Sequence, residues 1–105
     1  YAMLDKYPVT DGHTLIIPKR HFADYFSITA EENHAVFDLI LSRKKALLDN
    51  DPSITGFNIG VNSGQAAGQT ILHCHIHLIP RRTGDLDDPR GGVRGVIPHK
   101  MRYSD

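Results

Sequence analysis

Three histidines alternate with apolar residues in the last third of the chain, at His73, His75 and His77. If residues 71–79 form a β-strand, side chains two positions apart project from the same face, so the three imidazoles stand side by side. The positions between them are apolar and would face the core, which fixes the register of the strand. An imidazole serves as a nucleophile, a proton carrier or a metal ligand near neutral pH, so this strand is the candidate reactive element.

Three interpretations are open for the histidine strand. The first is a solvated strand face that is rich in histidine and has no chemical role. The second is a metal site, which would need a further ligand such as His13, His21 or His99. The third is a nucleophilic imidazole that acts on phosphorus, with two neighbouring imidazoles to bind charged oxygens and to manage the proton of the leaving group. The spacing of the histidines alone does not choose between metal and phosphorus.

The segment that leads into this strand favours phosphorus. Residues 63–70 are small and polar and include Gly64, Gly68, Gln69 and Thr70. Amide N–H groups in such a loop, together with a hydroxyl, can form an anion cradle. The loop is not a Walker phosphate loop, because no Gly-Lys-Ser/Thr follows it. A simple connection that needs two glycines is the alternative.

Other elements must position the histidines, and their patterns predict two short strands and a helix. Residues 1–4 and 13–18 are rich in aromatic and β-branched residues and are separated by turn formers, which predicts an antiparallel pair ended by Pro18. Thr29-Ala30-Glu31-Glu32 has the form of a capping box, so a helix is expected to follow it. Apolar residues at three- and four-residue spacing continue that helix to residues 49–52.

Residues 56–62 predict a further half-buried strand, with Phe57, Ile59 and Val61 on one face. The sequence contains no internal repeat, so a single domain is expected over residues 1–105. Its last part, residues 85–105, is mildly basic and rich in glycine, and an irregular tail is expected there.

Composition argues against several classes of protein. Lys+Arg and Asp+Glu both number 12, so the overall charge demands neither a nucleic-acid polymer nor a membrane as partner. Cys74 is the only cysteine, which rules out a disulfide within this sequence and a four-thiolate zinc site. No apolar run approaches the roughly 20 residues that span a bilayer, and no signal-peptide pattern is present. We therefore expect a cytoplasmic protein, with residues preceding Tyr1 because the sequence opens in a strand-like run.

The histidine strand and its surroundings resemble the histidine triad (HIT) superfamily. The alternation His-φ-His-φ-His-φ-φ, where φ is apolar, defines that family, and residues 73–79 fit it throughout. Further family signatures occur in the same order at Asp5-Lys6-Tyr7-Pro8-Val9, Gly12 to His21, Asn62-Ser63-Gly64 and Gly68-Gln69-Thr70. The resemblance covers residues 1–84. Pro80-Arg81 and Gly84-Asp85 look more like the branch that contains the fragile histidine triad protein and bacterial diadenosine polyphosphate hydrolases than like the nucleoside phosphoramidase branch.

The resemblance implies a role for each of several residues. His75 would attack the α-phosphorus of a nucleotide, and water would convert the nucleotidyl-histidine to a nucleoside monophosphate. The backbone carbonyl of His73 would hold the other nitrogen of His75, while His77 would contact the phosphoryl oxygens and help the leaving group to depart. His13 would support the triad from behind. The implied substrate-binding residues are Asp5 for the ribose and Asn62, Gly68, Gln69 and Thr70 for the phosphate or the leaving group.

The implied activity is hydrolysis of a dinucleoside polyphosphate or a related nucleotide conjugate. One alternative is a nucleoside phosphoramidase or nucleotidyltransferase that uses the same adduct, and another is a nucleotide-binding or metal-binding module with little turnover. No metal or other cofactor is required for this chemistry, because imidazoles and amide donors can take the charge. Magnesium can still accompany a polyphosphate substrate.

The resemblance also implies an α+β fold, with an antiparallel sheet of about four to five strands, one main packed helix and a second copy in a homodimer. The family normally has an additional N-terminal strand and helix, and this sequence begins after them. In the tail, we hypothesise that Arg90 or Arg94 reaches substrate phosphates, with a disordered solvated tail as the alternative. His21 is expected to be structural, and His34 and His99 are expected to lie on the surface.

Overall fold

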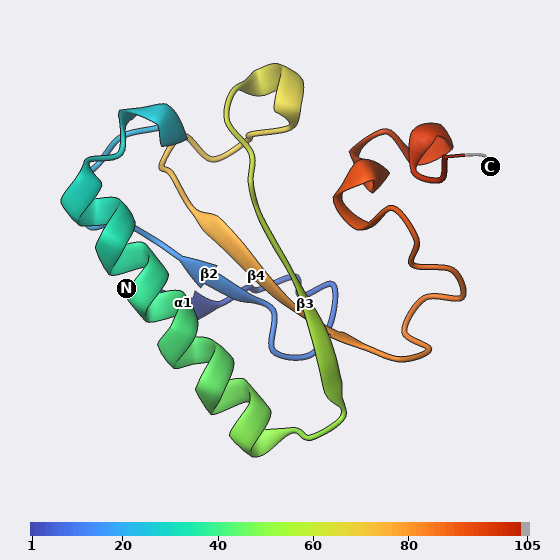
Figure 1. Cartoon of the computed structure of the whole chain (residues 1–105). Helices are drawn as coiled ribbons and strands as arrows, with labels where there is room; N and C mark the ends of the chain where they lie inside the picture. The colour runs from blue at the N-terminus through green and yellow to red at the C-terminus, as the bar shows by residue number, and fades with distance from the viewer. Residues whose placement is uncertain (104–105) are drawn as a thin grey trace.

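A four-stranded antiparallel sheet with one long helix packed across it forms the body of the computed structural model (Figure 1). The structure describes residues 1–103. The strands are β1 (Ala2–Leu4), β2 (Thr14–Ile16), β3 (Ile54–Val61) and β4 (Ile76–Arg82), and their order in the sheet is β1-β2-β4-β3. The predicted α+β class is confirmed, and so is the antiparallel pairing of the first two strands.

The helix α1 (Ala30–Asn50) begins at the predicted capping box. The backbone N–H of Glu32 donates to the Thr29 hydroxyl at 3.1 Å, and the Thr29 N–H donates back to the Glu32 carboxylate at 2.9 Å. The helix ends before Pro52, whose ring disfavours helical backbone at the preceding residue. Its Val36 and Ile40 side chains are buried against the sheet.

The sheet turns one face toward α1 and the other away from it. Ile16 pairs with Ile76, and these two residues and Leu78 are buried in the core with the helix. His77 lies one position along from Ile76, so its side chain projects from the opposite face. Ile59 was predicted on the buried face, but it is 51% exposed because β3 is an edge strand and this position lies at the rim of the helix contact.

The histidine strand begins later than predicted. β4 starts at Ile76, so His73, which lies in a bend, and His75 both precede the strand and take no part in the hydrogen-bonded pairing of β2 with β4. The register with β2 would place Pro18 opposite Cys74, and proline has no N–H to donate, so the ladder stops at the Ile16–Ile76 pair. The alternation survives, because Cys74 is buried while the three histidines are half-buried.

The tail contains two short 3₁₀ helices, η3 (Gly92–Val96) and η4 (Pro98–Lys100). Figure 1 shows it on the far side of β3 from α1. The last two residues of the tail predicted over 85–105 lie outside the described part of the chain. None of the helices in residues 1–103 has the length and apolar character needed to cross a membrane.

Candidate active site

His75 is held with one ring nitrogen occupied and the other free. Its Nδ1 lies 2.9 Å from the carbonyl oxygen of His73. Because a carbonyl oxygen can only accept, the proton of a neutral His75 ring sits on Nδ1. The lone pair is then on Nε2, which is the state that a nucleophilic imidazole requires.

His77 is oriented by His13, which lies behind it. The Nε2 of His13 is 2.9 Å from the Nδ1 of His77, and the backbone N–H of Val9 donates to the Nδ1 of His13 at 3.2 Å. The Val9 contact leaves the His13 proton on Nε2, which donates to His77. The proton of a neutral His77 is therefore on its Nε2.

Burial keeps this histidine pair neutral. His13 is 3% exposed, and desolvation lowers the pKa of its imidazole, although the nearby Asp5 carboxylate opposes the shift. Desolvation likewise lowers the pKa of His77, and the neighbouring His13 and His75 rings lower it further. Both rings are thus hydrogen-bonding groups rather than cations at neutral pH.

Asp5 lies beside the same histidines. One carboxylate oxygen is 3.5 Å from the Nε2 of His13, and the other accepts from the backbone N–H of Tyr7 at 2.9 Å. Asp5 also lines a cavity of about 390 Å³ together with His73 and His75. The structure therefore brings the predicted ribose-binding residue to the side of the candidate nucleophile.

His73 contributes its carbonyl to His75 and turns its own ring away. The Nε2 of His73 donates to the carbonyl of Pro18 at 2.7 Å, and its Nδ1 faces the Nδ1 of His21 at 3.0 Å. His21 thus packs edge-on against His73, and its structural role stays a prediction. His21 and His73 are 52 residues apart in sequence, so their contact could not be predicted from spacing and depends on the fold.

The loop before the histidines is held by Gln69. This side chain is 6% exposed, its carbonyl oxygen accepts from the N–H of Gly64, and its amide nitrogen donates to the carbonyls of Ala23 and Ile71. Gly68 closes the turn at a φ of 89°, in the left-handed region that glycine adopts without strain. These contacts fix the loop, so a phosphate contact from Gln69 stays a prediction. Thr70 is exposed at the end of the loop.

A second cavity of about 390 Å³ lies beside His77 and His13. Asn62, the predicted phosphate-side donor, lines this cavity and not the one that holds Asp5. A larger cavity of about 620 Å³ lies elsewhere, between the paired ends of β3 and β4 and residues 83–92, and its lining contains no histidine. The candidate reaction centre is therefore the histidine cluster between the two smaller cavities.

In the described part of the chain, one group of three side chains and one histidine pair can offer ligands to a metal. Ligand atoms of Asp5, His13 and His77 lie within 4.8 Å of one another, although His13 and His77 already share a hydrogen bond. The other group is the pair formed by His21 and His73, which could supply half of the four ligands of a tetrahedral zinc. Within residues 1–103, no further cysteine, histidine or carboxylate makes that pair a cluster of three.

The arginines predicted to reach phosphates point into the tail instead. Arg90 binds the carboxylate of Asp88, and Arg94 donates to the carbonyls of Lys100 and Met101. Neither lines the two cavities beside the histidines. His99 lies in η4 and is exposed, as expected.

An antiparallel sheet with three alternating histidines at the start of β4 and immediately before it, one of them with a free imidazole nitrogen, is typical of the histidine triad class. Sequence comparison agrees, because a HIT domain is recognised over residues 1–84. The chain belongs to this family.

Relatives extend the same conclusion. The nitrilase and fragile histidine triad fusion protein NitFhit of Caenorhabditis elegans is 38% identical over 88 residues, which are 84% of this chain and 20% of NitFhit. Adenylylsulfatase HINT3 of Arabidopsis thaliana is 42% identical over 88 residues, which are 80% of this chain and 42% of HINT3. The chain thus spans less than half the length of these two proteins.

The fold is shared with solved structures. A zinc-bound histidine triad family protein from Mycobacterium smegmatis superposes with a TM-score of 0.72 at 38% identity, over 80% of this chain and 60% of that one. The sheet with one main helix is therefore the HIT fold.

Proposed function

We propose that the chain hydrolyses a dinucleoside polyphosphate or a related nucleotide conjugate at the α-phosphorus, through a nucleotidyl adduct on His75. The observation that carries this proposal is the bond from His75 Nδ1 to the His73 carbonyl, which leaves Nε2 free. The names of two relatives support hydrolysis and a histidine triad activity, since one is an adenylylsulfatase and the other contains a fragile histidine triad protein.

The reaction has two displacements at phosphorus. In the first, the lone pair of His75 Nε2 forms a P–N bond, and the bond from phosphorus to the leaving oxygen breaks with its electron pair on that oxygen. The imidazole then carries positive charge, which the His73 carbonyl stabilises. In the second, a water oxygen attacks phosphorus, the P–N electrons return to Nε2, and one water proton passes to solvent. The products are a nucleoside monophosphate and the free leaving group.

His77 acts in this scheme as a hydrogen-bond donor. Its Nε2–H stabilises the phosphoryl or leaving oxygen, because His13 occupies its Nδ1. It is not a source of a proton, since loss of the Nε2 proton from a neutral ring would leave an imidazolate. Asp5 is proposed to accept from the ribose hydroxyls, and Asn62, Gly68, Gln69 and Thr70 are proposed to border the phosphates.

No metal is required by this scheme, and magnesium would only accompany a polyphosphate substrate. With adenosine 5′-(4-nitrophenyl phosphate), which contains no polyphosphate, release of nitrophenolate should continue in a chelator such as EDTA. Loss of activity that zinc alone restores would contradict this part of the proposal.

We also propose that two copies pair through the edge of β3, in the cytoplasm. Within residues 1–103, no strand covers the outer edge of β3. Beside it, a groove of about 370 Å³ is lined by Phe37, Ile40 and Ile59. Phe37→Glu should convert a dimer to a monomer in sedimentation equilibrium, whereas Phe26→Glu, at an exposed phenylalanine outside the groove, should not. A monomeric wild-type mass at micromolar concentration would contradict the dimer.

Turnover in isotopically labelled water tests the function. Cleavage of diadenosine triphosphate in water enriched in oxygen-18 should put the label in AMP and leave the released ADP unlabelled, because water attacks the α-phosphorus of the adduct. Label in ADP would contradict attack at that phosphorus. Binding of the nucleotide without turnover would favour a binding module.

A further inference from the structure

The tail segment η3 lies over the same face of the sheet as His77. His77 pairs with Gly60 and Ile79 pairs with Asn58, so these residues share the face that α1 does not cover. A Cβ added at Gly92 would lie 3.4 Å from the side-chain amide of Asn58, which shows how closely η3 approaches the strand. Val93 and Val96 line the cavity that His13 and His77 also line. η3 is therefore one wall of that cavity.

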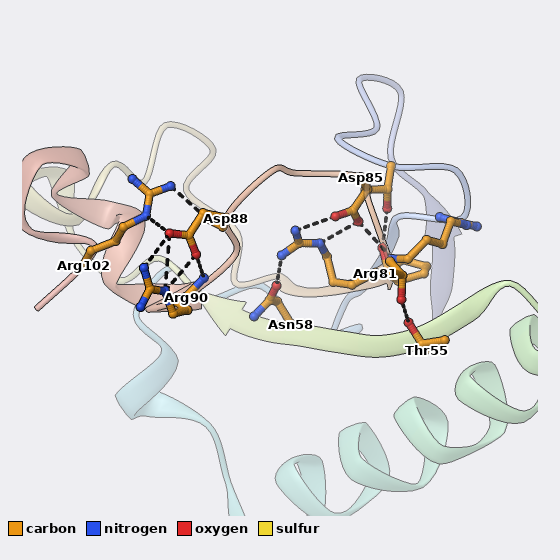
Figure 2. A network of polar contacts seen from close by, with 11 residues as sticks. Thr55, Asn58, Arg81, Asp85, Asp88, Arg90 and Arg102 are labelled. Atoms are coloured by element: carbon orange, nitrogen blue, oxygen red, sulfur yellow. Dashed lines mark hydrogen bonds and ion pairs between the residues drawn. The ribbon is translucent and has the colours of Figure 1, made fainter.

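Contacts away from the histidines hold this wall in place. Figure 2 shows the Asp88 carboxylate between the guanidinium groups of Arg90 and Arg102, at 3.0 and 2.8 Å. Gly91, which immediately precedes η3, has a φ of 95°, and a side chain there would collide with the Met101 carbonyl. The conformation of η3 is thus fixed within the tail.

A second set of contacts ties the tail to the sheet. Arg81 of β4 donates to the Asn58 side chain at 2.7 Å and binds both carboxylate oxygens of Asp85 at 2.8 Å (Figure 2). Asp85 also accepts from the backbone N–H of Arg82 at 3.0 Å. The turn after β4 is therefore locked, and the direction in which the tail leaves the sheet is set.

The lining of this cavity is uncharged. It combines the neutral His13 and His77 with two amide side chains and with apolar residues, and within residues 1–103 it includes no lysine, arginine, aspartate or glutamate. The other cavity, beside His75, contains Asp5 and Lys6. The two sides of the histidine cluster thus offer different chemistry to the two parts of a substrate.

We propose that Val93 and Val96 determine specificity for the leaving group, by contacting its uncharged part in the cavity beside His77. This inference rests on the proposed function. In displacement at phosphorus, the leaving group departs on the side opposite the attacking nitrogen. The ring centroids of His75 and His77 lie 5.2 Å apart, so His77 is close enough to contact a phosphoryl group bound at His75. The group that departs past His77 would enter the open cavity that η3 borders.

Two substrates that differ only in the leaving group test this proposal. Adenosine 5′-(4-nitrophenyl phosphate) releases an aromatic group that reaches the wall, whereas adenosine 5′-phosphorofluoridate releases fluoride, which is too small to reach it. Val93→Ala and Val96→Ala should each lower kcat/KM for the nitrophenyl ester by about threefold to tenfold and leave the fluoridate unchanged. Val96→Asp should lower it further, because a carboxylate repels the departing nitrophenolate.

Ile97→Ala is the matched control, since Ile97 is an exposed aliphatic residue of the tail that does not line the cavity. It should change neither rate. Equal losses for both substrates, or no loss for the ester in any valine variant, would overturn the proposal. Failure of the wild type to cleave either substrate would instead defeat the proposed function itself, and this inference with it.

Discussion

The Nε2 of His13 lies 2.9 Å from the Nδ1 of His77, while the N–H of Val9 occupies the other nitrogen of His13. A backbone N–H cannot accept a proton, so this chain of contacts runs in one direction only, from Val9 through His13 to His77. The orientation and the protonation of His77 are thus set by a residue 64 positions away. In the proposed mechanism, His13 would therefore be a positioning residue that acts through His77.

Replacement of His13 should impair catalysis through His77. We expect His13→Ala to lower kcat by about 10- to 100-fold, by analogy with loss of the hydrogen-bond partner of a metal-binding histidine. His13→Gln should recover part of the rate, because its side-chain amide can donate to the Nδ1 of His77. His34→Ala is the control, since His34 is an exposed histidine on α1. If His13→Gln is as slow as His13→Ala, with both folded, the positioning role is wrong.

Stability should fall as the pH drops below the ordinary pKa of histidine. Burial lowers the pKa of His13 and His77 in the folded protein from 6.5, whereas the unfolded chain keeps the ordinary value. Above pH 6.5 these residues are neutral in both the folded and the unfolded state. Below pH 6.5 the unfolded chain binds protons at these residues, whereas the folded protein binds them only below its lower pKa values, so stability falls. Urea unfolding from about pH 8 to about pH 5 should show this decline. It should be shallower in His13→Leu and unaltered in His34→Ala.

Gln69 should stabilise the loop before the histidines. Its amide makes three hydrogen bonds to backbone groups, so Gln69→Ala should lower the free energy of unfolding by about 1–3 kcal/mol. Gln65→Ala, at an exposed glutamine of the same loop, should have little effect. Chemical denaturation measures both variants. Equal stabilities of the two would show that the buried amide contributes nothing.

The side chain of His73 should matter far less than that of His75. His73 serves His75 through its backbone carbonyl, which survives in His73→Ala. His75→Ala should lower kcat by on the order of 10³-fold or more, since it removes the attacking atom. Steady-state kinetics of the two variants give the comparison, and an equal loss would mean that the His73 ring takes part in the chemistry.

Local pattern was enough to predict the helix and the shared face of the histidines. The capping box at Thr29 and the alternation around Cys74 depend only on neighbours in sequence, and both appear in the structure. The start of β4 depends instead on Pro18, which follows β2 and stops the pairing of the two strands from the opposite side. The exposure of Ile59 likewise arises because β3 is an edge strand, and the alternation of residues within β3 does not indicate its position in the sheet.

The contacts of the site depend on distance through space. His13 reaches His77 and His21 reaches His73 only after β2 and β4 pair, so spacing along the chain could not reveal either contact. The sequence of the tail suggested substrate-binding arginines because the positive charges of Arg90 and Arg94 can be identified from sequence, whereas their hydrogen-bond partners within the tail cannot. In the structure, Arg90 donates to the carboxylate of Asp88, and Arg94 donates to backbone carbonyl groups of the tail.

Direct trapping of the adduct tests the central claim, that His75 is the nucleophile. The protein would be mixed with a nucleotide conjugate radiolabelled at the α-phosphorus, quenched by denaturation during turnover, and analysed by peptide mass spectrometry. We predict an acid-labile, base-stable nucleotidyl group on His75 in the wild type and in His73→Ala, and none in His75→Ala. Label on another residue, or undiminished turnover in His75→Ala, would contradict the mechanism.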